Sequence, residues 1–341
     1  MMNRFVVLCL GLALLLSACG GGGVKPAPAD PEPTEMSKDI LDLLNDSIAK
    51  DEGRSDLYLQ RAKTYVEREQ VGAAMTDVNK AIEVDPKNID AFLMLADIYY
   101  MLGDQANITA ALNRALEINP YDSRPMVKLA EINMLQQNYD LALGYVDNAM
   151  KVNTFNPKAH FVEGMIYLAK QDTAAAVKCF LTSREQDADF FDPCYEVGKI
   201  YSAQDNPLSE RFLRSTVEHF PNQPLGRYEL ALYLQDHEQP DEALLHYDTL
   251  LAQQPNNSRL LYNKGYVYFV YLGENEKALD YFNQSLDADP NYIDALYNKG
   301  HVLEQMGDYV QAKTIYSQVL KRQPNYELAV KAMNRIANQT E

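Results

Sequence analysis

A four-residue sequence, YNKG, occurs twice in this chain, at Tyr262–Gly265 and again 35 residues later at Tyr297–Gly300. A small residue recurs at nearly the same interval within apolar segments, at Ala62, Ala96, Ala130, Gly164, Gly198, Ala231, Gly265 and Gly300. Prolines recur with similar spacing at Pro86, Pro120, Pro221, Pro255, Pro290 and Pro324. A period of this length indicates a stack of similar structural units and argues against one compact core.

Other positions of the repeat are also restricted. We number each repeat so that the recurring small residue, for example Ala62, is position 8. Position 11 is then often tyrosine, at Tyr65, Tyr99, Tyr167, Tyr201 and Tyr268, and position 20 is often alanine, at Ala74, Ala142, Ala176, Ala243, Ala278 and Ala312. The pattern resembles the tetratricopeptide repeat (TPR). Small residues let the two helices of a repeat cross closely, and the proline ends the second helix.

The resemblance implies an all-α chain, a right-handed superhelical solenoid of about eight helix-turn-helix repeats with a capping helix at each end. We expect the repeats within 55–326, at 55–88, 89–122, 123–156, 157–190, 191–223, 224–257, 258–292 and 293–326. Residues 38–54, with an amphipathic helix at Ile40–Lys50, and residues 327–341 are the expected caps. The ends of a solenoid need such covers.

The N-terminus carries a separate signal. Arg4 precedes the apolar run Phe5–Leu16, which is too short to span a bilayer comfortably and typical of a signal peptide. The sequence Leu16–Cys19 that follows resembles the bacterial lipobox, which implies a signal peptide at 1–18 and lipid attachment to Cys19. An ordinary signal peptide or membrane anchor with an incidental cysteine is the alternative. Residues 19–37, rich in Gly and Pro, are the expected tether.

The lipobox resembles that of lipoproteins from Gram-negative bacteria, and the whole chain is similar to TPR lipoproteins of the Bacteroidota type. Gly20, where some sorting systems read Asp as an inner-membrane signal, implies the outer membrane. Surface-exposed Bacteroidota lipoproteins tend to carry an acidic cluster directly after the cysteine. Here four glycines follow it, so we expect the protein to face the periplasm.

Several function classes are disfavoured. The formal net charge is −17 and no basic stripe is present, so we expect no nucleic-acid partner. No HExxH, GxSxG, P-loop or GxGxxG motif occurs, so we predict no enzyme, no catalytic residue, no cofactor and no metal. Cys179 and Cys194 fall on neighbouring predicted helices, and the sequence leaves open whether they form a disulfide or remain two buried thiols.

The resemblance places the first helix of each repeat along a concave groove. Position 5, which faces this groove, changes from aliphatic to aromatic along the chain, through Leu59, Leu93, Val127, Phe161, Tyr195, Tyr228, Tyr262 and Tyr297. Rigid aromatic rings with side-chain amides suit an extended peptide. The predicted peptide groove comprises Phe161, Tyr195, Tyr228, Tyr262, Asn263, Tyr266, Phe269, Tyr297, Asn298 and His301. Ordinary packing of these residues within the array is the alternative.

Two further expectations follow. Lys264 and Lys299 are expected to bury their stems and extend their charges to solvent. We expect the protein to be a lipid-anchored periplasmic scaffold or adaptor that binds other proteins or peptides in its groove at the outer membrane. The alternative is a fixed structural subunit of an envelope assembly such as a secretion, pilus or gliding machine. The sequence does not indicate which partner is bound.

Overall fold

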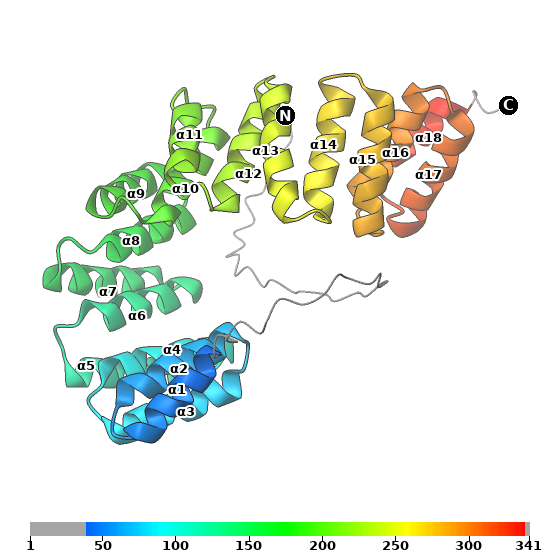
Figure 1. Ribbon diagram of the computed structural model, residues 1–341. Helices are drawn as coiled ribbons and strands as arrows, with labels where there is room; N and C mark the ends of the chain where they lie inside the picture. Colours follow the sequence, from blue (N-terminus) through cyan, green and yellow to red (C-terminus); the bar gives the residue numbers. More distant parts are fainter. Residues whose placement is uncertain (1–38, 338–341) are drawn as a thin grey trace. The chain divides into compact units, whose positions relative to one another are not determined.

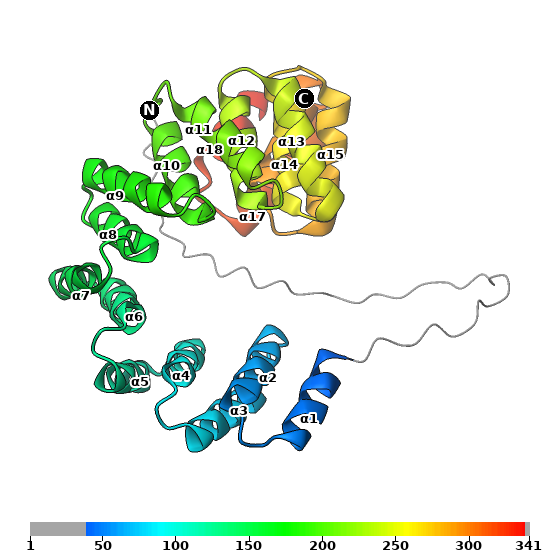
Figure 2. The ribbon, with the colours of Figure 1, turned by 60° about the vertical axis from the view of Figure 1, so that its left-hand side comes forward.

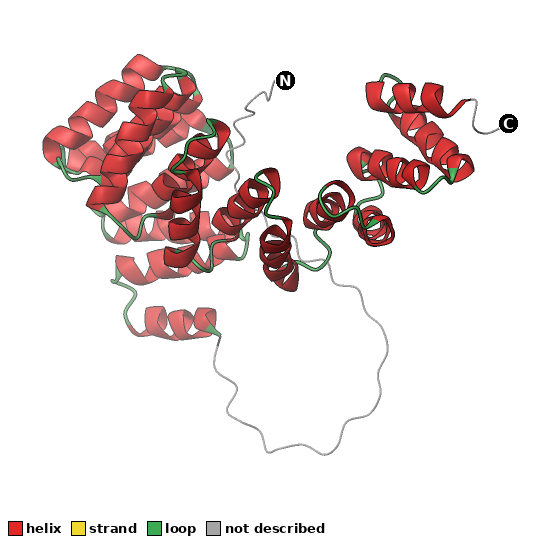
Figure 3. Cartoon of the chain, turned by 90° about the horizontal axis from the view of Figure 1, so that it is seen from above, coloured by secondary structure: helices red, strands yellow, loops and turns green. Residues whose placement is uncertain are grey.

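The structure is a computed structural model that describes residues 39–337. The predictions for the signal peptide, for Cys19 and for the tether at 19–37 therefore lie outside the described residues. Every regular element within residues 39–337 is a helix (Figure 3), which confirms the all-α prediction. The chain divides into two units, Met1–Glu52 and Gly53–Glu341.

The described part of the first unit contains one helix, α1 (Ile40–Lys50). Asp39 caps its start, because the Asp39 carboxylate accepts the Leu41 N–H at 3.3 Å. Asp42 in the first turn and Lys50 in the last turn complement the helix dipole. The helix has the expected bounds, and its role as a cap stays a prediction.

The second unit contains eight helix pairs and a final helix. The pairs are α2 (Ser55–Glu67) and α3 (Val71–Val84), α4 (Ile89–Met101) and α5 (Gln105–Ile118), α6 (Ser123–Leu135) and α7 (Tyr139–Val152), α8 (Pro157–Ala169) and α9 (Thr173–Gln186), α10 (Phe191–Ala203) and α11 (Ser209–His219), α12 (Pro224–Asp236) and α13 (Pro240–Gln253), α14 (Ser258–Val270) and α15 (Asn275–Ala288), and α16 (Ile293–Gln305) and α17 (Tyr309–Arg322); α18 (Glu327–Ile336) follows. The first helix of every pair starts at the first residue of an expected repeat.

Consecutive helices of this unit pack side by side in chain order (Figures 1 and 2). Contacts also join helices that are two apart, namely α2 with α4, α6 with α8, α10 with α12, α14 with α16 and α16 with α18. Among helices α2–α17, the pairs that approach most closely in this way are pairs of first helices, so the first helices lie on the inner side of the array. We call the surface of these helices the first-helix face.

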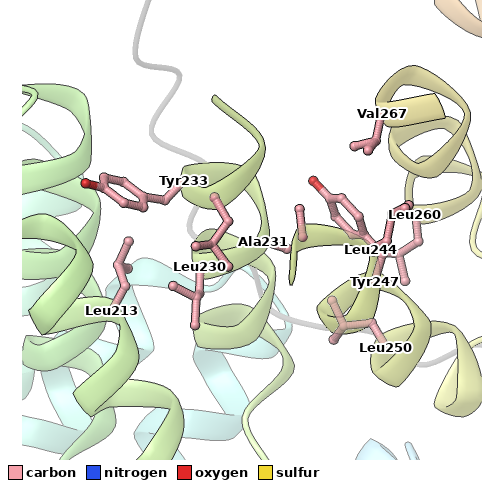
Figure 4. Packing of buried hydrophobic residues seen from close by; sticks show 11 residues of the cluster. Leu213, Leu230, Ala231, Tyr233, Leu244, Tyr247, Leu250, Leu260 and Val267 are labelled. Atoms are coloured by element: carbon pink, nitrogen blue, oxygen red, sulfur yellow. The ribbon is translucent and has the colours of Figure 1, made fainter. Parts of the chain in front are cut away.

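The core explains why small residues recur. In repeat seven a Cβ atom added to Gly265 would lie 2.8 Å from the Phe282 ring, and in repeat eight one added to Gly300 would lie 2.8 Å from the Tyr316 ring. Both rings are fully buried. The helices can approach this closely only because the facing residue has no side chain. Figure 4 shows a core cluster to which α11, α12, α13 and α14 all contribute side chains.

Candidate protein-binding face

Hydrogen bonds between successive repeats join the predicted tyrosines to the predicted asparagines. The Asn263 amide Nδ2 donates to the Tyr228 hydroxyl at 3.2 Å, and the Asn298 amide Nδ2 donates to the Tyr262 hydroxyl at 3.0 Å. In each case position 6 of one first helix reaches position 5 of the preceding first helix. The tyrosine column therefore links α12 to α14 and α14 to α16.

These links occupy groups that were predicted to face a peptide. Asn263 is 6% exposed, Asn298 is 8% exposed and Tyr297 is 9% exposed. Burial also raises the pKa of the Tyr262 hydroxyl, so this hydroxyl stays protonated. In this structure Asn263, Asn298 and Tyr297 pack within the array, as the alternative interpretation holds, and a direct role for them in binding stays a prediction.

Besides Tyr262, three predicted residues on α14 and α16 are partly exposed: Tyr266, Phe269 and His301. We call them the aromatic patch. The Phe269 and His301 rings meet edge to face with centroids 4.9 Å apart, and Tyr266 lies 6.2 Å from the half-buried Tyr262 ring beneath it. Burial lowers the pKa of His301, so its imidazole is neutral at neutral pH. The patch presents rigid apolar rings with a polar imidazole among them.

Phe161 and Tyr195 lie in separate clusters. The Phe161 ring packs against Phe180, with centroids 5.6 Å apart, while the Tyr195 ring stacks on Phe191 at 5.5 Å. The Tyr195 hydroxyl donates to Glu229 at 3.5 Å. Within the described chain neither ring contacts the aromatic patch. The Tyr195–Glu229 bond still joins position 5 of repeat five to position 6 of repeat six, as the tyrosine–asparagine bonds do in the later repeats.

The same face is built differently in repeats two and three. Arg124 on α6 contacts Asp90 on α4, with 2.6 Å between Nη1 and Oδ1, and Lys128 pairs with Asp97 on the same two helices. Three of the four side chains are more than half exposed, and the Lys128 side chain is 31% exposed. Here ion pairs replace the tyrosine–asparagine hydrogen bonds as the connection between successive first helices.

Lys264 departs from the expected arrangement. Its side chain is only 5% exposed, and its ammonium group binds Asp248 and the Tyr281 hydroxyl, the latter at 2.8 Å. The expectation that this charge extends to solvent is wrong, because the exposed Asp248 carboxylate on α13 and the Tyr281 hydroxyl on α15 cover the ammonium group. Neither partner could be read from the sequence, since each is 16 or 17 residues away on a different helix.

The last helix is attached through a buried carboxylate. Glu304 on α16 accepts two hydrogen bonds from Arg335 on α18, at 2.5 Å and 2.7 Å, and a third from the Tyr316 hydroxyl at 2.7 Å. Ala329, Ala332 and Ile336 are buried on the same helix. α18 thus covers the end of the array through both apolar packing and this ion pair.

Both described cysteines are free and buried. Burial, with Glu163 nearby, raises the pKa of Cys179 to about 12, and burial also raises the pKa of Cys194. The question that the sequence left open is therefore answered in favour of two protonated thiols. Thiols of this kind are poor nucleophiles and weak metal ligands.

In residues 39–337, no group of three or more His, Cys, Asp or Glu is placed to hold a metal ion. No helix in this range has the length and apolar content to cross a membrane. One surface depression lies on the α11 side of repeat five, lined by Pro207, Glu210, Arg211, Arg214, Ser215 and Glu218. It contains none of the predicted site residues.

Comparison with known proteins defines the class. Models of the tetratricopeptide repeat match residues 55–88, 78–109, 228–293 and 269–336. The repeats at both ends of the array are thus tetratricopeptide repeats, and the described part of the second unit is a solenoid of this type. No curated protein sequence matches the chain.

Two solved structures agree on the fold, and a third is reported for its partial similarity. The Cut9–Hcn1 hetero-tetramer of APC/C aligns with a TM-score of 0.57 and 19% identity over 86% of this chain and 58% of that one. A tetratricopeptide repeat protein from Parabacteroides merdae aligns with a TM-score of 0.50 and 16% identity over 72% and 97%. YrrB, described as a TPR protein with an unusual peptide-binding site, is 25% identical over 56% of this chain and 98% of its own, with a TM-score of 0.47.

Proposed function

We propose that this protein is a scaffold that binds other proteins or peptide segments on the first-helix face of repeats six to eight. The observation that carries the proposal is the aromatic patch, whose rings are partly exposed while the neighbouring Asn263 and Asn298 are buried and hydrogen-bonded between repeats. A surface that is already ordered loses little conformational entropy on binding. Aromatic side chains on such a surface are the usual anchors of a protein interface.

The neighbours of the patch indicate the chemistry of its ligand. Val270, the residue after Phe269 at the end of α14, is about half exposed, at 48%. Together with the neutral His301, the rings and Val270 favour a segment that inserts apolar side chains and offers a hydrogen bond. An extended or helical peptide with two or three apolar anchors has this chemistry.

We also propose that a lipid on Cys19 holds the scaffold at the outer membrane, on its periplasmic side. The support is the order of a charged start, an apolar run and the sequence Leu16–Cys19. Cys19→Ala is expected to abolish incorporation of radiolabelled palmitate and to release the protein from the membrane fraction. Unchanged labelling in this variant would disprove attachment at Cys19.

The binding proposal is tested with matched substitutions in the native host. Phe269 and Tyr100 occupy position 12 of repeats seven and two, and Tyr100 is 45% exposed. After crosslinking, Phe269→Ala is expected to reduce partner capture about tenfold or more, the size of an interface hot spot. Tyr100→Ala is the control and is expected to leave capture unchanged.

Circular dichroism and thermal unfolding of both variants separate lost binding from lost folding. Equal losses of capture in the two variants, or a loss that follows unfolding, would contradict the proposed face.

Purification in detergent tests the alternative role as a fixed subunit. Several substoichiometric partners would be expected for a scaffold. One stoichiometric complex that survives high salt would instead favour a fixed subunit of an envelope assembly.

A further inference from the structure

The connections between repeats present one side chain in the same way along the array. This side chain belongs to the second-to-last residue of the repeat. In five of the connections the backbone N–H of that residue donates to the side-chain oxygen of an Asp or Asn two residues earlier, at 2.9 to 3.2 Å. The residues presented in these five turns are Lys87, Tyr121, Phe155, Asp189 and Asn291. The turn holds the backbone, so the side chain at this position points away from it in a defined direction.

Repeats two and three differ from the others at this position. Tyr121 is 79% exposed and Phe155 is 71% exposed, the two highest values among large apolar side chains of the described chain. The remaining repeats have polar residues here: Lys87, Asp189, Asn222, Asn256, Asn291 and Asn325. These two aromatic rings bury too little area to contribute to folding. Their turns follow α5 and α7 and lie on the same edge of the unit (Figure 1).

The charge around these rings also differs from that of the whole chain, which is −17. Residues 114–158 contain five basic and five acidic residues, so this segment is neutral. Lys151 and Lys158 stand on either side of Phe155 and are exposed. At the equivalent turn of repeat four the chain instead carries the acidic pair Asp187 and Asp189, and in repeat seven Asp287 at the end of α15 precedes Asp289 of the turn.

We propose that this edge, formed by Tyr121, Val152 and Phe155, rests on an anionic lipid surface. Tyrosine rings prefer the headgroup level of a bilayer, and phenylalanine side chains insert at the boundary with the acyl chains. Lysine stems can lie along this boundary while their ammonium groups meet phosphates. Basic residues next to a membrane are attracted by its negative potential, and the acidic turns of later repeats are repelled by it. Repeats two and three therefore face the membrane.

A protein partner fits this edge less well. Three side chains offer far less than the roughly 800 Å² per partner that a stable protein interface buries. A lipid surface needs no complementary pocket, and aromatic side chains held on rigid turns can insert into it. The contact is separate from the first-helix face, and it does not depend on the proposed function or on a lipid at Cys19.

The composition of the chain allows a direct test, because it contains no tryptophan. The full-length chain, purified in detergent, is reconstituted into vesicles of phosphatidylethanolamine and phosphatidylglycerol as the variants Phe155→Trp and Asn291→Trp. Both residues occupy the same hydrogen-bonded turn, in repeats three and seven. Phe155→Trp is expected to emit at shorter wavelength, to be quenched by brominated lipid and to be shielded from iodide. Asn291→Trp is expected to emit as in water and to remain open to iodide.

Charge provides the second readout. Adding Lys151→Gln or Lys158→Gln to Phe155→Trp is expected to lower the ratio of lipid-contacting to free states about fivefold for each lysine. Circular dichroism checks that these exposed substitutions leave the fold intact. Water-like emission of Phe155→Trp in anionic vesicles would overturn the proposal, including the case in which only an added protein partner shields the indole. Equal lipid quenching of both tryptophan variants would also overturn it, since the contact would then not be specific to this edge.

Discussion

Repeats two and three and repeats six to eight join their first helices by different interactions. In the former, Arg124 and Asp90 form an ion pair whose side chains are 54% and 63% exposed. In the latter, Asn298 donates to Tyr262 within a mostly buried layer. Exposed ion pairs contribute little because water and salt compete with them, whereas buried hydrogen bonds are costly to break. The comparison indicates that the later repeats hold a more rigid face, which is where we place binding.

The cores of the two regions also differ in composition. Repeats two and three pair an alanine with an aliphatic residue, as at Ala130 and Val146, and repeats seven and eight pair a glycine with an aromatic ring, as at Gly265 and Phe282. Between the two regions the summed volume of the pair changes less than the volume of either residue, because the larger ring is paired with a smaller residue. A substitution at the ring should therefore cost more than one at the valine.

The largest expected effect tests this core difference. Phe282→Ala should lower the free energy of unfolding by about 3–5 kcal/mol, since it removes a fully buried ring and leaves a cavity. Val146→Ala in repeat three, also fully buried, should cost about 2 kcal/mol. Urea unfolding of the full chain, followed by circular dichroism, measures both. Equal costs would show that the two cores are equivalent.

A double-mutant cycle tests the pairing itself. Gly265→Ala alone should destabilise by about 1–3 kcal/mol, because the new methyl group meets the Phe282 ring. In the background Phe282→Leu the same change should cost much less, since it recreates an alanine–aliphatic pair of the earlier type. Costs that are simply additive would mean that the two residues are not coupled.

The next effect concerns the attachment of α18. Hydrogen bonding from Arg335 holds the pKa of Glu304 below its usual value of 4.5, although burial acts in the opposite direction. The ion pair therefore stabilises the fold fully above about pH 4.5, and this contribution is lost as the pH falls through the lower folded-state pKa. Arg335→Ala should cost about 1–3 kcal/mol at neutral pH by leaving a buried carboxylate without its cation.

Hydrogen exchange of the α18 amides measures this effect locally. Acidification should lower the protection factors of these amides, which are corrected for the intrinsic exchange rate at each pH, and Glu304→Gln should make the protection factors less dependent on pH. The exposed Lys128–Asp97 pair offers a control, because Lys128→Gln should leave α18 unaffected. Exchange in α18 that stays unchanged by Arg335→Ala would show that apolar packing alone holds this helix.

The sequence predicted the repeat pattern well because the relevant information is local. Each first helix starts where the period places it, and side-chain caps such as Asn88 and Asn156 mark several of these starts. Links between repeats were not predictable in this way. Asn263 meets Tyr228 from 35 residues away, and Lys264 meets Asp248 from another repeat, so both contacts depend on how adjacent helix pairs stack. The peptide-binding role of the predicted residues remains to be tested.

The smallest expected effect distinguishes the two kinds of link by salt. Lys128→Gln should cost about 0.2–1 kcal/mol at low ionic strength, as exposed ion pairs do, and nearly nothing at about 1 M salt, where charges are screened within about 3 Å. Asn298→Ala should cost about 1 kcal/mol at either salt concentration, because a hydrogen bond between neutral groups is not screened. Urea unfolding at the two salt concentrations measures both. A salt-dependent cost for Asn298→Ala would mean that charged groups contribute to the link in repeats seven and eight, and the contrast between the two regions would then be one of degree.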